Sequence, residues 1–362
     1  MKINSNIQAM IAGNVLSNNE TKQSNSTERL SSGYKLNSAK DNPAGMAISN
    51  RMRAQIASLN KANQNSSNAV NVIETAEGAL SEIQSMAQRI SELSVRSANG
   101  TNTEEDRKAI QEEVDQLTKE IERIARDTEY NGQNLLGGEQ RMKGYSDTLG
   151  VNVLDYDADF PTGKPYELSF STDGDGNVTS VSLINGFETT AETSVEGGRI
   201  TIRNKGGSEM TIKADASLAG TSVTTKLDIQ GIGGMKIQVG SQEGQEIQVA
   251  IPNISLDNLG LTGIDVTTEE GAAKAMDQTK NAISYISHVR SKLGAYENRF
   301  ETTISNLDVA TENLTQSYST IKDVDMAKEM TEYTTLQVLV QAGTSMLAQA
   351  NEQPQQALQL LQ

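Results

Sequence analysis

The chain has 362 residues, of which 36% are hydrophobic and 4% aromatic, and it contains no tryptophan. This composition is too poor in apolar residues for one large core, whereas long helices with narrow apolar faces need fewer of them. The net charge of −16 argues against a nucleic-acid partner, because phosphates require clustered lysines and arginines. With no cysteine and only His288 as histidine, disulfides, zinc–thiolate sites, cysteine nucleophiles and two-histidine metalloprotease motifs are excluded. We expect no cofactor.

The N-terminal residues include no apolar stretch like that of a secretory signal peptide. No segment approaches the roughly 20 apolar residues that span a membrane. We therefore expect a protein without membrane insertion. It is either cytoplasmic or exported by a route that does not require a cleaved signal peptide.

Proline and glycine are distributed unevenly along the chain. Residues 1–42 and 253–353 contain no proline, and 21 of the 29 glycines fall between Gly132 and Gly263. Because both residues disfavour helix interiors, the sequence predicts long helices at both ends and a turn-rich middle. A helical chain with a β-type insert must bring its ends together to bury their apolar faces.

The N-terminal third predicts three helices. A weak helix over residues 1–31, ended by Gly33, carries sparse apolar residues at helical spacing: Ile3, Ile7, Met10, Ile11 and Val15. A second helix starts at Pro43 and ends near Ser97. Its best section alternates spacings of four and three, as coiled coils do: Ala69, Ile73, Ala76, Leu80, Ile83, Ala87 and Ile90.

A third helix is predicted to begin after Thr103, a suitable cap followed by three acidic residues, and to end at Tyr130-Asn-Gly. Its apolar residues keep the same spacing: Ile110, Val114, Leu117, Ile121 and Ile124. Residues 133–265 then show short segments of alternating hydrophobicity separated by glycine-rich turns. Period-two alternation at this spacing predicts an antiparallel β region.

Helical periodicity returns after Thr267, and the sequence predicts a polar break over residues 317–323 and a final helix ended by Pro354. The final helix carries a wide apolar stripe that would expose apolar surface if it stood alone, whereas residues 1–31 are too weakly apolar to be stable alone. Pairing of the two terminal segments, together with self-assembly, would stabilise residues 1–31 and cover the apolar stripe of the final helix. The predicted polymerisation residues are Ile3, Ile7, Ile11, Met326, Met330, Tyr333, Val340, Leu347, Leu360 and Leu361.

Several strings in the chain resemble those of bacterial flagellins. They are INSN from Ile3, LSSGYKLNSAKDNPAGMAI from Leu30, TAEGAL from Thr75, QRISELSVRSANGT from Gln88, YNGQNLL from Tyr130 and PQQALQLL from Pro354. The resemblance covers roughly residues 1–137 and 268–362, in the right order and at the right ends of the chain.

The resemblance implies a mainly α fold with a β insert, in which the N- and C-terminal segments form a long antiparallel helical hairpin beside a small antiparallel β domain. It implies three domains. Residues 1–42 and 322–362 form a terminal coiled coil that lines the filament core, and 43–165 with 267–321 form a helical rod with a β-hairpin. Residues 166–266 form the variable outer domain.

The resemblance also implies a function and partners. The chain would be exported through the flagellar channel, without a cleaved signal peptide, to the extracellular flagellum. There it would self-assemble into the filament used for motility, with a flagellar export chaperone and cap proteins as partners. Vertebrate Toll-like receptor 5 recognises many flagellins through a motif in the second helical segment and its neighbour. The residues of this motif map here to Arg89, Leu93 and Glu113.

Three other readings of the sequence stay open. A hook–filament junction protein would share the terminal helices and be a trace component of sheared filaments. An enzyme carried in the insert would need metal or nucleophile motifs, which the single histidine argues against, so we expect no enzyme. A coiled-coil adhesin would not depend on flagellar export.

Overall fold

The structure is a computed structural model that describes residues 6–157, 160, 164, 166–173, 177–187, 191–196, 198–204, 208–214 and 218–359. Ile3, Leu360 and Leu361 of the predicted polymerisation set lie outside the described residues. The chain divides into two compact units, residues 1–60 with 307–362 and residues 61–306, and each is described by itself.

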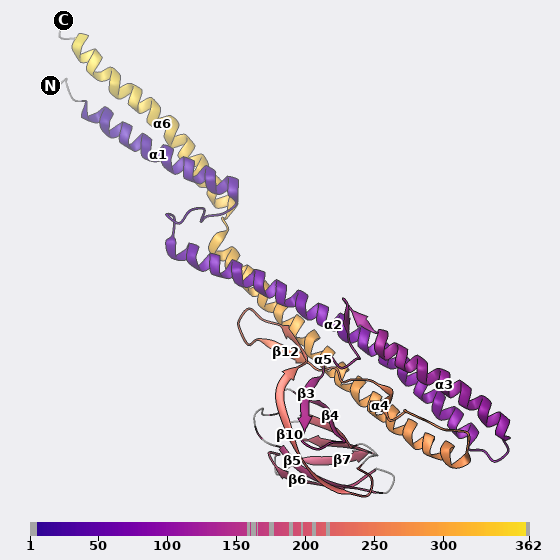
Figure 1. Cartoon of the computed structure of the whole chain (residues 1–362). Helices are drawn as coiled ribbons and strands as arrows, with labels where there is room; N and C mark the ends of the chain where they lie inside the picture. The colour runs from indigo at the N-terminus through magenta and orange to yellow at the C-terminus, as the bar shows by residue number, and fades with distance from the viewer. Residues whose placement is uncertain are drawn as a thin grey trace. The chain divides into compact units, whose positions relative to one another are not determined.

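Helices dominate both ends of the chain and strands its middle, as predicted (Figure 1). The helices are α1 (Ile7–Ser32), α2 (Pro43–Ser97), α3 (Glu104–Asp127), α4 (Leu256–Leu259), α5 (Glu269–Lys322) and α6 (Met326–Gln359). The strands are β1 (Glu129–Tyr130), β2 (Gln133–Asn134), β3 (Met142–Ser146), β4 (Val151–Tyr156), β5 (Tyr166–Thr172), β6 (Val178–Asn185), β7 (Glu192–Glu196), β8 (Arg199–Arg203), β9 (Glu209–Ala214), β10 (Ser222–Gly233), β11 (Met235–Gln238) and β12 (Glu246–Val249).

The predicted helix ends follow local capping chemistry. Gly33 ends α1 in the left-handed conformation (φ 75°), and its N–H donates to the Arg29 carbonyl at 2.8 Å. Thr103 and Asp106 form a reciprocal capping box at the start of α3. Pro43 is the first residue of α2, where its missing N–H has no consequence.

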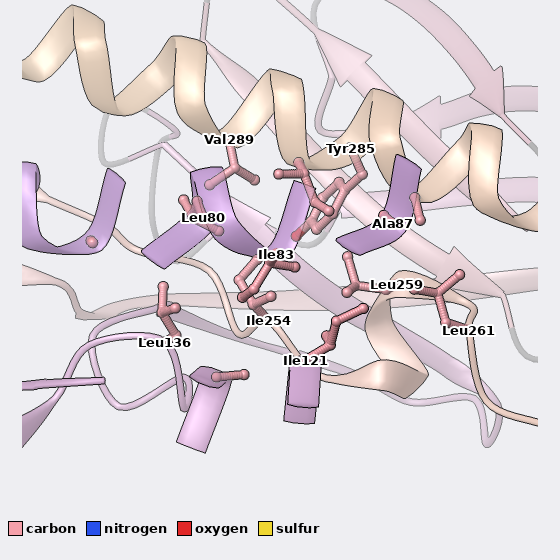
Figure 2. Packing of buried hydrophobic residues seen from close by; sticks show 14 of the residues in the cluster. Leu80, Ile83, Ala87, Ile121, Leu136, Ile254, Leu259, Leu261, Tyr285 and Val289 are labelled. Atoms are coloured by element: carbon pink, nitrogen blue, oxygen red, sulfur yellow. The ribbon is translucent and has the colours of Figure 1, made fainter. Parts of the chain in front are cut away.

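The predicted coiled-coil section of α2 is the centre of the main core. All seven of its residues, from Ala69 to Ile90, are at most 2% exposed. They pack with buried residues of α3, α4 and α5 and with Leu136 and Ile254, which lie outside the helices and strands (Figure 2). Full burial of this many apolar side chains, at roughly 1.5–3 kcal/mol for each large one, makes this core the main source of stability in the second unit.

Polar contacts hold the helices of this unit in register. The amide of Gln111 on α3 donates to the Ile264 carbonyl at 2.9 Å and accepts from the Val266 N–H at 2.7 Å. Arg290 on α5 donates to Gln84 on α2 at 2.7 Å and also pairs with Glu77.

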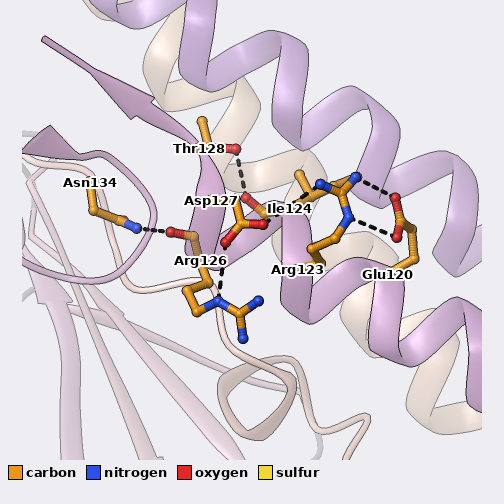
Figure 3. A network of polar contacts seen from close by, with 7 residues as sticks. All are labelled: Glu120, Arg123, Ile124, Arg126, Asp127, Thr128 and Asn134. Atoms are coloured by element: carbon orange, nitrogen blue, oxygen red, sulfur yellow. Dashed lines mark hydrogen bonds and ion pairs between the residues drawn. The ribbon is translucent and has the colours of Figure 1, made fainter. Parts of the chain in front are cut away.

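The end of α3 is tied to the β1–β2 hairpin (Figure 3). Thr128 Oγ1 donates to the Ile124 carbonyl at 2.6 Å, and the Asn134 amide donates to the Arg126 carbonyl. The hairpin turn places Asn131 (φ 52°) and Gly132 (φ 75°) in the left-handed region. The helix therefore ends at Asp127, three residues before the predicted end.

The middle of the chain forms antiparallel sheets, as predicted. Two four-stranded sheets have the orders β3-β10-β5-β6 and β4-β9-β8-β7, and their buried residues form a second hydrophobic cluster. Strands β5 and β6 are consecutive in the chain and pair as an antiparallel hairpin. A bulge between Ile229 and Ile232 bends β10, the long strand that pairs with both β3 and β5.

Two predicted helix boundaries at the C-terminal end were wrong. The helix α5 continues through the predicted polar break to Lys322, and within it the hydroxyls of Ser317 and Thr320 donate to carbonyls four residues earlier, so these polar side chains are accommodated without ending the helix. The helix α6 continues past Pro354 to Gln359. Proline removes one intrahelical hydrogen bond, and here this loss does not end the helix.

Candidate functional site

The terminal helices α1 and α6 lie side by side and antiparallel within the first unit (Figure 1). Three contacts fix their pairing. Asn6 Nδ2 donates to the Ala350 carbonyl at 2.7 Å, and Arg29 Nη1 lies 3.8 Å from Glu329 Oε1. Between them, Gly343 allows Leu16 to approach so closely that an added Cβ would lie 3.2 Å from Leu16 Cδ1. The two ends of the chain are therefore brought together, as the sequence analysis expected.

The face that α1 and α6 share is narrow and partly polar. Ser26, Glu329 and Leu336 are its most buried residues, at 2%, 6% and 6% exposure. Ser26 Oγ and Glu329 Oε1 are buried without a hydrogen-bond partner among the described residues. A buried hydroxyl without a hydrogen-bond partner is unfavourable, and Glu329 Oε1 has the 3.8 Å ion pair with Arg29 in place of a hydrogen bond, so the α1–α6 pair is weakly stabilised within one chain. The predicted residues Tyr333, Val340 and Leu347 are half-buried on α6.

The apolar stripe of α1 is exposed, although α1 has a partner helix. Its four large side chains are 52–64% exposed, and α6 exposes a second apolar set at 45–64%. The α1 set is Ile7, Met10, Ile11 and Val15, and the α6 set is Met326, Met330, Val338, Leu339 and Met346. The sequence analysis did not single out Val338, Leu339 and Met346 for polymerisation.

A short connection ties the base of this pair together. Gly33 and Lys35 exchange backbone hydrogen bonds with Val324 and Lys322, at 3.0 and 2.8 Å. The Tyr34 ring lies 5.1 Å from Lys322 Nζ. The two helices therefore enter the pair from one junction, which the Gly33–Val324 and Lys35–Lys322 hydrogen bonds hold together.

The predicted receptor residues lie in the second unit and have unequal exposure. Arg89 on α2 and Glu113 on α3 form an ion pair at 2.8 Å, with both side chains about half exposed at 49% and 45%. Arg89 also pairs with Glu92 at 3.3 Å. The hydrogen bond from Glu113 raises the pKa of the Arg89 guanidinium above its usual value. Leu93 is only 2% exposed and belongs to the main core.

A buried ion cluster joins the β sheets to α5. Lys292 Nζ lies 2.6 Å from Asp155 Oδ2 and 2.7 Å from Asp157 Oδ1. Burial opposes the charge of Lys292, but the two carboxylates outweigh it and keep the lysine pKa above its usual value. Its partners are more than 130 residues away in sequence, and no local pattern predicts them.

His288, the single histidine, belongs to the same junction. Its Nε2 lies 2.7 Å from Glu209 Oε2, and Arg203 pairs with the other oxygen of Glu209. The hydrogen bond from His288 and the nearby Arg203 lower the pKa of Glu209 to about 2. A groove of about 550 Å³ runs past these side chains, whose charges are paired with one another. This arrangement holds the β domain on α5. Within the described ranges, no group of acidic or histidine side chains is placed to hold a metal ion.

Comparison with known proteins identifies the family. The model of the bacterial flagellin N-terminal helical region matches residues 3–141, and that of the C-terminal helical region matches residues 274–361. Flagellin D of Vibrio anguillarum is 36% identical to the chain, with 100% of this chain and 99% of the relative covered. The chain belongs to the bacterial flagellin family. A flagellin of Clostridium tyrobutyricum is 35% identical over 98% of this chain and 100% of its own length.

Flagellins are structural subunits of the flagellar filament, and the chain is such a subunit. Among solved structures, a flagellin of Bacillus cereus is 20% identical, covers 67% of this chain and 88% of that chain, and has a TM-score of 0.34. A flagellar junction protein of Legionella pneumophila is 16% identical, covers 77% and 100%, and also has a TM-score of 0.34. The assignment to the filament rests on the full-length sequence identity. In the described part of the chain, no helix is long and apolar enough to cross a membrane.

Proposed function

We propose that the exposed apolar stripes of α1 and α6 are the surfaces through which the subunit polymerises. The single observation that carries this proposal is that Ile7, Met10, Ile11 and Val15 stay more than half exposed although α1 is paired. The proposed terminal domain comprises residues 1–42 and 322–362, the helical rod 43–165 and 267–321, and the outer domain 166–266. Ile3, Leu360 and Leu361 extend the stripes on sequence grounds.

Burial between subunits would supply the stabilisation that the isolated pair lacks. A fully buried large apolar side chain contributes roughly 1.5–3 kcal/mol, so covering a half-exposed one contributes about 1 kcal/mol. Nine such side chains are exposed among the described side chains of the two helices. Their combined burial, repeated for every neighbour along a polymer, would favour ordered assembly over the free subunit.

Seeded polymerisation of purified protein tests this proposal. The variant carrying Ile7→Ser and Ile11→Ser removes two exposed side chains without touching the shared face, and we expect its critical concentration to rise at least tenfold. The matched control is Ile184→Ser on β6, whose side chain is similarly exposed at 55% and should polymerise normally. Deleting residues 341–362 should abolish polymerisation and leave the β domain folded. Normal filaments from either terminal variant would overturn the proposal.

We propose that the subunit reaches the extracellular flagellum through the flagellar export channel, without a cleaved signal peptide, and meets an export chaperone and cap proteins on the way. The family assignment supports this route. Mass spectrometry of sheared filaments tests it: the subunit should dominate by mass and retain its N-terminal residues. Trace abundance would instead favour the junction-protein alternative, and secretion that persists without the flagellar export apparatus would contradict the route.

We propose further that the subunit has no enzymatic activity.

We also propose that vertebrate Toll-like receptor 5 binds the subunit at Arg89 and Glu113. The half-exposed ion pair supports direct contact by these two residues, while Leu93, which is buried, supports the surface from beneath. Receptor-reporter cells treated with Arg89→Ala or Glu113→Ala monomers should respond at least tenfold more weakly. Arg123→Ala on α3, an exposed ion-paired arginine, is the matched control. An unchanged response would contradict this contact.

A further inference from the structure

The helix α6 contains one interior carbonyl that proline leaves without its usual donor. Each helical carbonyl normally accepts from the N–H four residues later. Pro354 has no N–H and lies within α6, which continues to Gln359, so the carbonyl of Ala350 loses its intrahelical partner. Pro354 is the one proline of this helix, and Ala350 is therefore the one interior carbonyl that proline frees.

The side chain of Asn6 bonds to this carbonyl and to α1 at the same time. Its Nδ2 donates to the Ala350 carbonyl at 2.7 Å, across 344 residues of sequence. Its Oδ1 accepts from the Ala9 N–H at 3.1 Å, the usual N-cap bond of a helix. One amide thus satisfies an unpaired donor at the start of α1 and an unpaired acceptor near the end of α6. A carboxylate of the same shape could form only the first bond.

We propose that Asn6 is a positioning residue that sets the register of α1 against α6, using the carbonyl freed by Pro354. A slide of α6 by one residue would move that carbonyl by about 1.5 Å along the axis and turn it away from Asn6. The Arg29–Glu329 ion pair and the close approach of Leu16 to Gly343 also lie on the shared face, but neither of them uses the carbonyl that Pro354 frees. The inference rests on the proposed function, because register decides where the exposed stripes of the two helices meet a neighbouring subunit.

A double-mutant cycle with Asn6→Asp and Pro354→Ala tests this pairing. Asn6→Asp keeps the N-cap acceptor and removes the donor, so α1 should form normally while the Ala350 carbonyl faces a carboxylate. We expect the critical concentration for seeded polymerisation to rise about five- to tenfold, the cost of an unpaired partly buried carbonyl. Pro354→Ala restores an N–H four residues after Ala350. In that background, Asn6→Asp should change the critical concentration less than twofold.

The cycle separates this inference from a general effect of the N-terminus on assembly. The inference would be overturned if Asn6→Asp polymerised like the wild type. It would also be overturned if Asn6→Asp raised the critical concentration equally with and without Pro354. Failure of the wild-type chain to polymerise would instead overturn the proposed function. In that case, hydrogen exchange of α6 amides in the free subunit decides the inference: Asn6→Asp should accelerate exchange only in the presence of Pro354, and unchanged exchange would overturn it.

Discussion

The terminal helix pair and the core of the second unit use similar apolar spacing with opposite results. Ile83, Ile90 and Ile121 are fully buried, whereas Ile7 and Ile11 are 61% and 57% exposed. In the core, the apolar faces of α2, α3 and α5 pack against one another, while in the described part of the first unit α1 packs along one helix, α6. An apolar repeat therefore determines which residues share a face, and the number of neighbouring elements determines whether one chain can cover it.

The largest effect on the stable unit should come from its buried charges. Lys292→Met leaves Asp155 and Asp157 without their cation and should lower the free energy of unfolding of this unit by about 3–5 kcal/mol. Urea denaturation followed by circular dichroism measures this change. The matched control is Lys108→Met, which breaks an exposed ion pair with Glu104 and should leave unfolding unchanged. Equal behaviour of the two variants would show that the buried cluster does not hold the β domain.

The same type of substitution, isoleucine to alanine, compares the two regions when it is made once in each of them. Ile121→Ala in the core should lower the free energy of unfolding of the second unit by about 2–4 kcal/mol, because it removes buried atoms and leaves a cavity. Ile11→Ala should leave the urea midpoint of the free subunit unchanged within error and impair polymerisation. A comparable loss of stability in both variants would mean that the α1 stripe is already covered within one chain.

Acid should weaken the junction between the β domain and α5 in a defined pH range. The pKa of Glu209 is about 2 in the folded chain and 4.5 ordinarily, so its stabilisation is present above pH 4.5 and lost as the pH falls toward 2. The contribution is at most about 3 kcal/mol. Unfolding free energies measured between pH 6 and 3 should fall more steeply for the wild type than for Glu209→Gln. Parallel curves would contradict this role.

The smallest effect concerns a helix end inside the stable unit. Thr103→Ala removes the capping box of α3 and should lower the free energy of unfolding by about 1 kcal/mol. Thr118→Ala, at an exposed position within the same helix where the hydroxyl bonds to the Asp115 carbonyl, serves as the control for loss of a hydroxyl. If the cap is formed as described, thermal unfolding should give a lower midpoint for Thr103→Ala than for Thr118→Ala. Equal midpoints would contradict the role of the cap.

Local chemistry in the sequence predicted much of the helical framework. The proline at the start of α2, the Thr103 cap and the seven-residue series from Ala69 to Ile90 all lie where they were expected. These features depend on contacts within a few residues or on a strong repeat. The alternation of the middle segments likewise predicted antiparallel strands, although it could not predict the order of the strands within each sheet.

The features that sequence reasoning missed depend on distant partners. The continuation of α6 beyond Pro354 overrides local helix-breaking chemistry, and Asn6, at the other end of the chain, bonds to the carbonyl that the proline frees. The cluster of Lys292 with Asp155 and Asp157 joins segments far apart in sequence. The outward direction of the α1 stripe depends on which face α6 occupies, and periodicity alone carries no information about that choice.

Chemical protection of a single cysteine tests the central claim most directly, because the chain has no cysteine of its own. Ile11→Cys and the control Ile184→Cys should react with a maleimide at similar rates in the free subunit, since the two native side chains are 57% and 55% exposed. In assembled filaments, we expect the label at position 11 to react at least tenfold more slowly and the label at position 184 to be unaffected. Equal labelling of position 11 in filaments and free subunits would contradict the assignment of the α1 stripe to the polymer interface.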